Sequence, residues 1–361
     1  MSYNAGMWKV SLALIGHRLL LLVVALLAIN VHLASLAPAN AGPRLLPTAT
    51  LWTGFVQRVH EGQEFQEMEK LSAVSPKEIF RATRNPFLWA TRWLMSLTGM
   101  RSQTALLLLS NLFLILFLSE LVALLNRMGT PDVAEGAAML MVLWPTSFEM
   151  SLGDSSALMA FLVTLIVRQA IDNRWLIAGL ALFFLGLMDP IVLGLLPMLI
   201  YFFWFFQRHY QVQQVLKRTA FFLIPLGCAL YLRWHEYPSV GSIFSGSALG
   251  DIMAWAKQPA AARASLSRSF SGQLVTVVFF AIGAGVSLLS NSGLMYRLVP
   301  LNQFVVWLFF TPYAQVASRA PLAAVCLGGV ASATSQKVMR GICAVLLFLS
   351  AYEAFLTFSV A

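Results

Sequence analysis

Charged residues are scarce in this chain. Only 11% of its 361 residues are Asp, Glu, Lys or Arg, whereas 59% are hydrophobic. Soluble domains carry roughly 25% charged residues, and a water-soluble fold could not bury so much apolar surface. Unbroken apolar runs such as Leu19 to Ile29 argue against a transmembrane barrel, because barrel strands alternate apolar and polar residues. The composition therefore predicts an all-α, polytopic bundle of transmembrane helices.

Cysteine is nearly absent. The three cysteines all lie in apolar stretches, without the CxxC or CxxH spacing of a metal site: Cys228, Cys326 and Cys343. We interpret them as small core residues, so neither a disulfide framework nor a metal centre is indicated. Signatures of soluble enzymes are missing as well, including a glycine-rich phosphate loop, HExxH, GxSxG and a Walker lysine. We expect no cofactor, and dependence on a divalent cation is left open.

The apolar runs predict about eleven spans of near twenty residues, the length that crosses a bilayer, in a single transmembrane domain of residues 1–361. The first run ends in Ala37-Pro38-Ala39 and imitates a signal peptide, but it is too long for a typical cleavable segment, so we favour an uncleaved span. The expected spans lie near 10–37, 104–125, 134–150, 155–171, 175–189, 190–206, 219–232, 273–290, 295–312, 320–334 and 340–360.

The net charge of +9 is spread between the apolar runs, which disfavours nucleic acid as a partner and favours membrane orientation as the explanation. With a cytoplasmic N-terminus, the short outer turns carry Arg319 beside three carboxylates, Glu149, Asp154 and Asp189. This asymmetry follows the positive-inside rule and predicts the orientation of the chain. We expect the chain to lie in a bacterial inner membrane. The expected inner segments carry the other cations outside the long loops: Lys9, Arg18, Arg127, Arg168, Arg174, Arg208, Lys217, Arg218, Arg297, Lys337 and Arg340.

Two long extracytoplasmic loops are expected, residues 38–103 and residues 233–272. The first interleaves aromatic and aliphatic residues with arginines over 51–59 and 79–94, as interfacial amphipathic helices do. A solvated cover over the bundle and a substrate-binding loop both fit this pattern. The second loop is expected to be irregular, with short helices.

Polar residues inside or between spans are functional candidates, because a charge in hydrocarbon is costly. Glu120 lies near the inner end of its predicted span, where it could reach the interface or pair with Arg127 in a structural role. The segment 143–154 interrupts two apolar runs with a proline, hydroxyls and carboxylates, which predicts a tight outer re-entry. Asp189 could cap the helix after Pro190 or act in a site.

Several stretches together resemble one family. They are Asn85 to Asn111, Pro145-Thr146-Ser147-Phe148 followed by Ser151, Arg168 to Gly179, and Gly186 to Pro190 followed by Leu196-Pro197. Their order is similar to that of the GT-C superfamily of polytopic glycosyltransferases, which take sugar from a polyprenyl-phosphate carrier. The resemblance is closest to the family of the second mannosyltransferase of GPI-anchor synthesis and its bacterial relatives. It implies an outward-facing sugar-transfer site.

The chain departs from this family at three motif positions. The family's Trp-Asp-Gly, whose Asp is the expected base, matches Trp52-Thr53-Gly54 here, and a threonine hydroxyl cannot accept a proton as a carboxylate can. The family's Thr-Glu-Ser matches Ser155-Ser156-Ala157, with Asp154 two places early. The Arg of its Arg-Pro turn is replaced by Asp189.

Two interpretations follow. In the first, the protein transfers a mannose-like sugar from a polyprenyl phosphate at the extracytoplasmic face, with Asp154, Asp189 or Glu61 as base. In the second, it is a catalytically degenerate relative that binds lipid or scaffolds an envelope assembly. Its partners are then membrane lipids, a polyprenyl-phosphate-linked sugar and proteins of the same membrane. The resemblance and charge pattern give these substrate-binding candidates: Trp52, Thr53, Gly54, Arg58, Arg84, Glu149 and Arg319.

Overall fold

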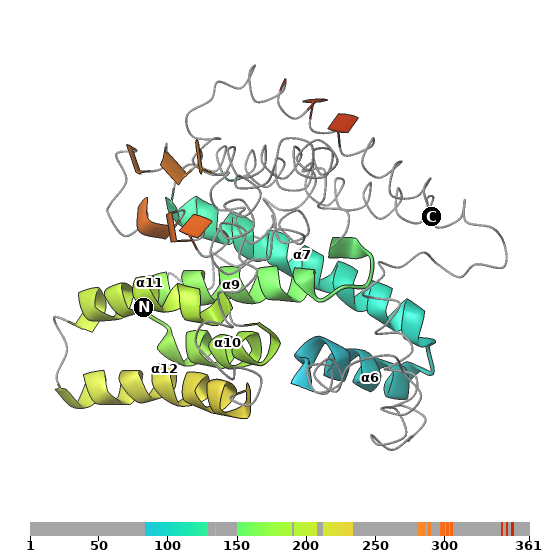
Figure 1. The fold of residues 1–361 in the computed structure, drawn as a ribbon, viewed down its shortest axis with the longest axis horizontal. Coiled ribbons are helices and arrows are strands. Elements are labelled where there is room, and N and C mark those ends of the chain that lie inside the picture. Colours follow the sequence, from blue (N-terminus) through green and yellow to red (C-terminus); the bar gives the residue numbers. More distant parts are fainter. Residues whose placement is uncertain are drawn as a thin grey trace, which may run out of the picture.

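The computed structural model describes residues 84–128, 150–189, 191–207 and 212–233, together with residue 134 and isolated positions in 281–305 and 341–349. This part of the chain is helical and contains no strand (Figure 1), which confirms the all-α prediction for it. Its helices are α6 (Pro86–Thr98), α7 (Ser102–Met128), α9 (Ser156–Ile171), α10 (Trp175–Met188), α11 (Ile191–Gln207) and α12 (Val212–Arg233). The first expected span, most of the 38–103 loop and the 234–272 region lie outside the described residues.

Within the described residues, two helices are long and apolar enough to cross a membrane, Ser102–Arg127 within α7 and Val212–Leu232 within α12. The helices α9, α10 and α11 are apolar but shorter, with 16, 14 and 17 residues. At 1.5 Å per residue α10 is about 21 Å long, less than the roughly 30 Å of a hydrocarbon core. The structure thus supports membrane association through two candidate spans, and the count of about eleven remains a prediction.

The amphipathic segment expected at 79–94 overlaps α6, which begins at Pro86 and continues beyond that segment to Thr98. Proline suits the first position of a helix because its missing N–H would have no helical partner there. The Asn85 side chain accepts a hydrogen bond from the Phe87 backbone N–H at 3.0 Å, and the helix ends at Gly99 in the left-handed conformation. Both ends are therefore set by local sequence.

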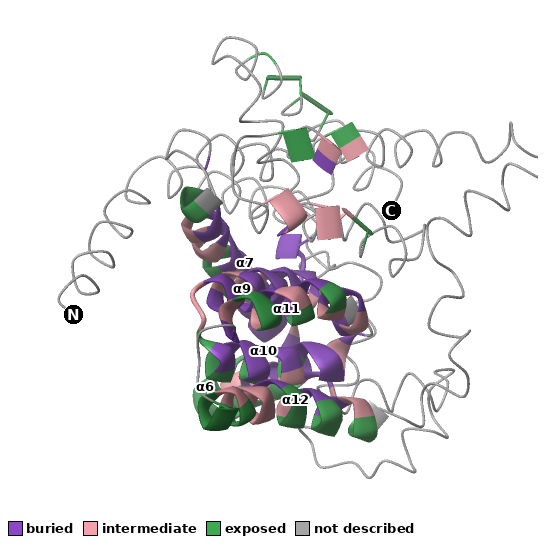
Figure 2. Cartoon of the chain, turned by 90° about the vertical axis from the view of Figure 1, so that its left-hand side faces the viewer, coloured by how far each residue is buried: buried purple, intermediate pink, exposed green. Residues whose placement is uncertain are grey.

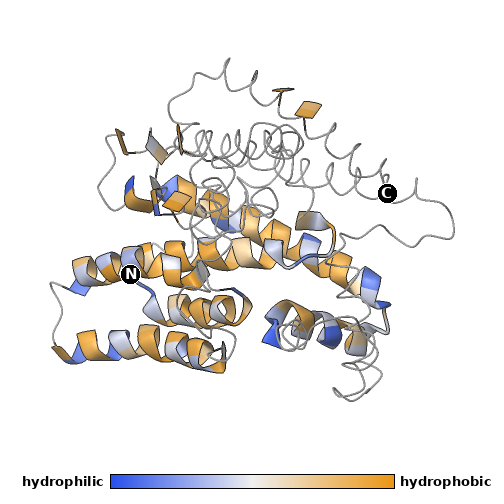
Figure 3. Cartoon of the chain, viewed as in Figure 1, coloured by the Kyte–Doolittle hydropathy of each residue, from blue (hydrophilic) through white to orange (hydrophobic). Residues whose placement is uncertain are grey.

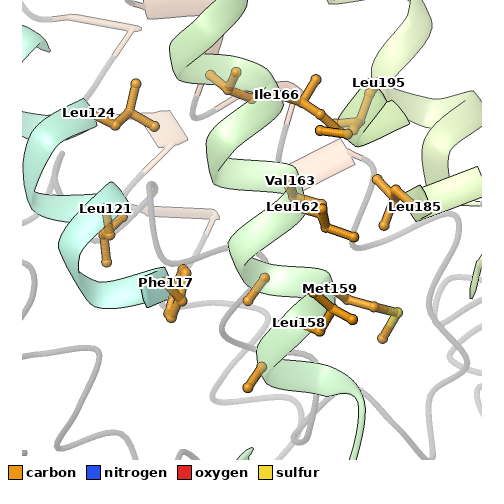
Figure 4. Close-up of a cluster of buried hydrophobic side chains, with 14 of the residues drawn as sticks. Phe117, Leu121, Leu124, Leu158, Met159, Leu162, Val163, Ile166, Leu185 and Leu195 are labelled. Carbon is orange, nitrogen blue, oxygen red and sulfur yellow. The ribbon is translucent and has the colours of Figure 1, made fainter. Parts of the chain in front are cut away.

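The core lies where α7, α9 and α10 pack side by side (Figures 2 and 4). Each helix contributes residues at spacings of three and four, which fall on one helical face. Because α9 lies between α7 and α10, it is buried on almost every side. The core side chains shown are Phe117, Leu121 and Leu124 of α7; Leu158, Met159, Leu162, Val163 and Ile166 of α9; and Leu185 and Leu195.

Hydrophobic residues, orange in Figure 3, run along α7 and alternate with polar ones along α12, and many of them are exposed. In α12 only 17% of the most apolar window is buried. Cys228 lies on this helix and is exposed, so the interpretation of Cys228 as a core residue was wrong. Large exposed apolar side chains include Leu112, Ile115 and Leu116 of α7, Leu176, Ile177 and Phe184 of α10, Trp204 of α11, and Leu223 and Ile224 of α12.

Glycines bring α10 and α12 into close contact. A Cβ added to Gly179 would overlap the carbonyl oxygen of Phe221 and lie 3.1 Å from its carbonyl carbon. A Cβ on Gly186 would come within 2.8 Å of the Ala229 methyl group. The two glycines are seven residues apart and therefore share a face of α10. Small residues at such a contact are typical of packed membrane helices.

Candidate functional site

The α9–α10 hairpin has two chemically different ends. A three-residue turn at 172–174 joins the two helices, so they run antiparallel. Asp154 precedes α9 and Asp189 follows α10, and both carboxylates therefore lie at the end away from this turn. We call this the carboxylate end, and the end at 172–174 the basic end. In Figure 1 the carboxylate end faces α6.

Arg84 also belongs near the carboxylate end. Arg84 lies two residues before the start of α6. The Phe87 ring of this helix lies 6.3 Å from the ring of Phe113 in α7. Phe113 in turn lies 6.2 Å from Phe161, in the second turn of α9. The structure thus places Asp154, Asp189 and Arg84 toward the same end of the bundle.

A buried polar contact fixes the turn that precedes α9. The Ser110 hydroxyl donates a hydrogen bond to the Ser151 carbonyl at 3.1 Å and accepts one from the Gly153 N–H at 3.1 Å. The neighbouring Asn111 amide also donates to the Ser151 carbonyl at 3.1 Å. Two adjacent residues of α7 therefore satisfy backbone groups that would otherwise be buried without partners. This contact holds Asp154 in place at the start of α9.

Asp154 itself is half-buried and accepts a hydrogen bond from the Ser156 hydroxyl. The side chains of these two residues therefore meet at the start of α9, a contact that their separation of two positions in the sequence does not show.

Asp189 is in a different environment. It ends α10 in an extended conformation and is only 6% exposed. Its backbone N–H donates to the Leu185 carbonyl at 2.9 Å. A carboxylate this well buried is poorly placed to meet a substrate, and of the two aspartates Asp154 is the more accessible. The remaining candidates lie outside the described residues: Trp52, Thr53, Gly54, Arg58, Glu61, Glu149 and Arg319.

Ion pairs join the helices toward the basic end. Glu120 of α7 pairs with Arg168 of α9, with one nitrogen–oxygen distance of 2.9 Å, and Arg127 pairs with Asp172 at 3.3 Å. The prediction that Glu120 could pair with Arg127 was wrong. Those residues are seven apart on one helix, about 10 Å along its axis, whereas Arg168 faces Glu120 from the adjacent helix.

Asn173 is the centre of the turn at the basic end. Its φ of 59° is left-handed, a conformation that asparagine tolerates better than most residues. Its side-chain oxygen accepts hydrogen bonds from Trp175 Nε1 at 2.7 Å and from Arg218 Nη1 at 3.1 Å. One amide therefore connects the α9–α10 turn to α12. Sequence reasoning missed this residue, although Asp-Asn between apolar helices is a turn signal.

Metal ligands do not gather in the described part of the chain: no group of three or more His, Cys, Asp and Glu side chains occurs there. The comparisons with known proteins give no family for this chain. No family model matches it, and neither a curated protein nor a solved structure is significantly similar.

Proposed function

We propose that this chain is a GT-C-like integral membrane glycosyltransferase homologue that takes a mannose-like sugar from a polyprenyl phosphate. In a bacterial inner membrane with a cytoplasmic N-terminus, the carboxylate end faces the extracytoplasmic side. The observation that carries the proposal is the hydrogen bond between Asp154 and Ser156, which puts a carboxylate beside the position of the family's Glu. Arg84 at the same end supplies a cation for the carrier phosphate.

The proposed reaction is an inverting transfer. Asp154 accepts the proton of the acceptor hydroxyl as its oxygen attacks the anomeric carbon of the sugar. The bond from that carbon to the polyprenyl-phosphate oxygen breaks, and the phosphate leaves with the electron pair and is held by Arg84. General base catalysis of this kind contributes about 10²- to 10⁴-fold to a rate, and a cation fixed at the leaving phosphate stabilises the charge that develops there.

A second candidate is the degenerate relative, which binds the lipid-linked sugar without transferring it. Two observations favour it. Thr53 stands where the family has its catalytic Asp, and Asp189, where the family has an Arg, is a buried carboxylate that would repel a phosphate. In this case the protein is a lipid-binding or scaffolding subunit of an envelope assembly.

The deciding experiment measures transfer of radiolabelled mannose from polyprenyl-phosphate mannose by the full chain in membranes. We expect Asp154→Asn to lower turnover about 100-fold or more. Asp172→Asn is the matched control, because it makes the same chemical change at the basic end, and we expect it to leave turnover within about twofold. Unchanged turnover in Asp154→Asn would refute Asp154 as the base.

The same assay separates the two candidates. Saturable donor binding without turnover in the unmodified chain would support the degenerate relative and contradict the enzyme. If Thr53→Asp then restored transfer, the loss would be assigned to that position. Absence of both binding and turnover would overturn the enzyme and the binding of a lipid-linked sugar by the degenerate relative.

A further inference from the structure

We propose that the basic end binds the phosphate of an anionic phospholipid, with the acyl chains of the lipid on the exposed faces of α10 and α12. This site is distinct from the carboxylate end and does not depend on the function proposed for it. It consists of the 172–174 turn with the side chains that meet it from α7 and α12.

Cations from three parts of the chain converge on this turn. Arg127 reaches it from the last turn of α7 through Asp172, and Arg218 reaches it from α12 through Asn173. Arg174 is the third residue of the turn and is exposed. Three guanidinium groups therefore lie at this turn, two held by contacts to its first two residues and one on its third residue. The planar guanidinium group matches the oxygens of a phosphate.

The charge at this end is strongly unbalanced. Among the described residues it holds five cations against two carboxylates, Glu120 and Asp172, a surplus of three positive charges. Glu120 neutralises Arg168 and Asp172 neutralises Arg127. The surplus cations are therefore Arg174, Lys217 and Arg218, of which Arg174 and Lys217 are exposed. A surface of this kind attracts a ligand of opposite charge, and each Lys or Arg near an anionic membrane surface favours binding about fivefold.

Apolar side chains lie next to these cations. Leu176, Ile177 and Leu180 lie on the first turns of α10, and each of these residues is 41% to 50% exposed. On α12, Leu216 is next to Lys217 and is 72% exposed. A free phosphate ion would use only the cations. A phospholipid uses both features, because its headgroup meets the arginines while its chains cover the leucines. The combination of charge and apolar surface therefore favours an anionic lipid over a soluble anion.

The test is a native mass spectrometry titration of the purified full chain with phosphatidylglycerol and, in parallel, with phosphatidylcholine. We expect tighter binding of phosphatidylglycerol. The double variant Arg174→Ala with Lys217→Ala should raise its apparent Kd by about fivefold for each cation removed. Replacing the same residues by the other cation, Arg174→Lys with Lys217→Arg, should keep the Kd within about threefold of the unmodified chain.

The matched control is Arg92→Ala with Arg101→Ala, two exposed arginines toward the opposite end of the bundle. We expect this variant to bind phosphatidylglycerol normally. An equal loss in both alanine variants would overturn the site, as would equal affinity for the two lipids. Competition by inorganic phosphate at concentrations matching the lipid would overturn the lipid as occupant. Unfolding temperatures in phosphatidylcholine check that every variant remains folded.

Discussion

The contact between α10 and α12 at Gly179 gives the sharpest prediction for the fold. Gly179→Ala would put a methyl group into the carbonyl of Phe221. Ordinary van der Waals contacts need about 3.5 Å, so the two helices must separate by on the order of 1 Å. Overpacking of this kind costs about 1–3 kcal/mol. We expect a loss near the middle of this range, because the contact is with backbone and cannot be relieved by a side-chain rotation.

The assay is thermal unfolding of the full chain in one fixed detergent. Gly227→Ala on α12 is the matched control, because a Cβ there would meet nothing within 4 Å. Alanine also favours helix over glycine by about 1 kcal/mol, so this variant should be as stable as the unmodified chain or more stable. Equal unfolding temperatures for the variants at Gly179 and Gly227 would refute the close approach of the two helices.

A double variant tests the same contact further along the helix. Gly186→Ala should destabilise the protein because its methyl group would lie 2.8 Å from the Ala229 methyl group. Here the clash is between side chains, so adding Ala229→Gly should restore most of the lost stability. Failure of this rescue would mean that the two positions do not meet.

Three other predictions concern the polar contacts. Glu120→Leu should cost about 3 kcal/mol in the same unfolding assay by leaving Arg168 partly buried without its carboxylate, and adding Arg168→Met should recover most of it. Asn111→Leu should cost about 0.5–1.5 kcal/mol, because the Ser151 carbonyl loses one of its two side-chain donors and keeps the Ser110 hydroxyl; unchanged stability would show that the Asn111 amide does not stabilise the turn. Asp154→Ser with Ser156→Glu should keep sugar transfer within about tenfold, whereas Asp154→Ser alone should lose it.

The helices themselves were largely predictable. The expected spans at 155–171, 175–189 and 190–206 match α9, α10 and α11 to within one residue at each end. They could be predicted because polar residues and prolines separate the long apolar runs. The start of α12 was missed: a span was expected from residue 219, but the helix begins at Val212. Its first turns contain Gln213, Gln214 and Lys217, which are good helix formers of low hydropathy. A search for apolar runs finds hydrophobic segments, whereas the backbone continues as helix beyond them.

The pairing of polar side chains could not be predicted in the same way. Glu120 has a cation seven residues later on its own helix, and nothing in the sequence shows that Arg168, forty-eight residues away, lies opposite it. Such pairs depend on the rotation and register of two packed helices, which follow from the fit of core side chains and of small residues such as Gly179. Local sequence determines where a helix begins and ends, and long-range packing determines what its polar residues meet.

The carboxylate end shows how this limit bears on function. The sequence shows Asp154 and Ser156 as separate polar residues before an apolar run. In the structure the Ser156 hydroxyl donates a hydrogen bond to the Asp154 carboxylate, so the two act as one polar group at the start of α9. Thr53 has no such neighbour in sequence, since the nearest carboxylate is Glu61. The proposed sugar transfer therefore requires Asp154 as the base, and the turnover of the Asp154→Asn variant tests that requirement.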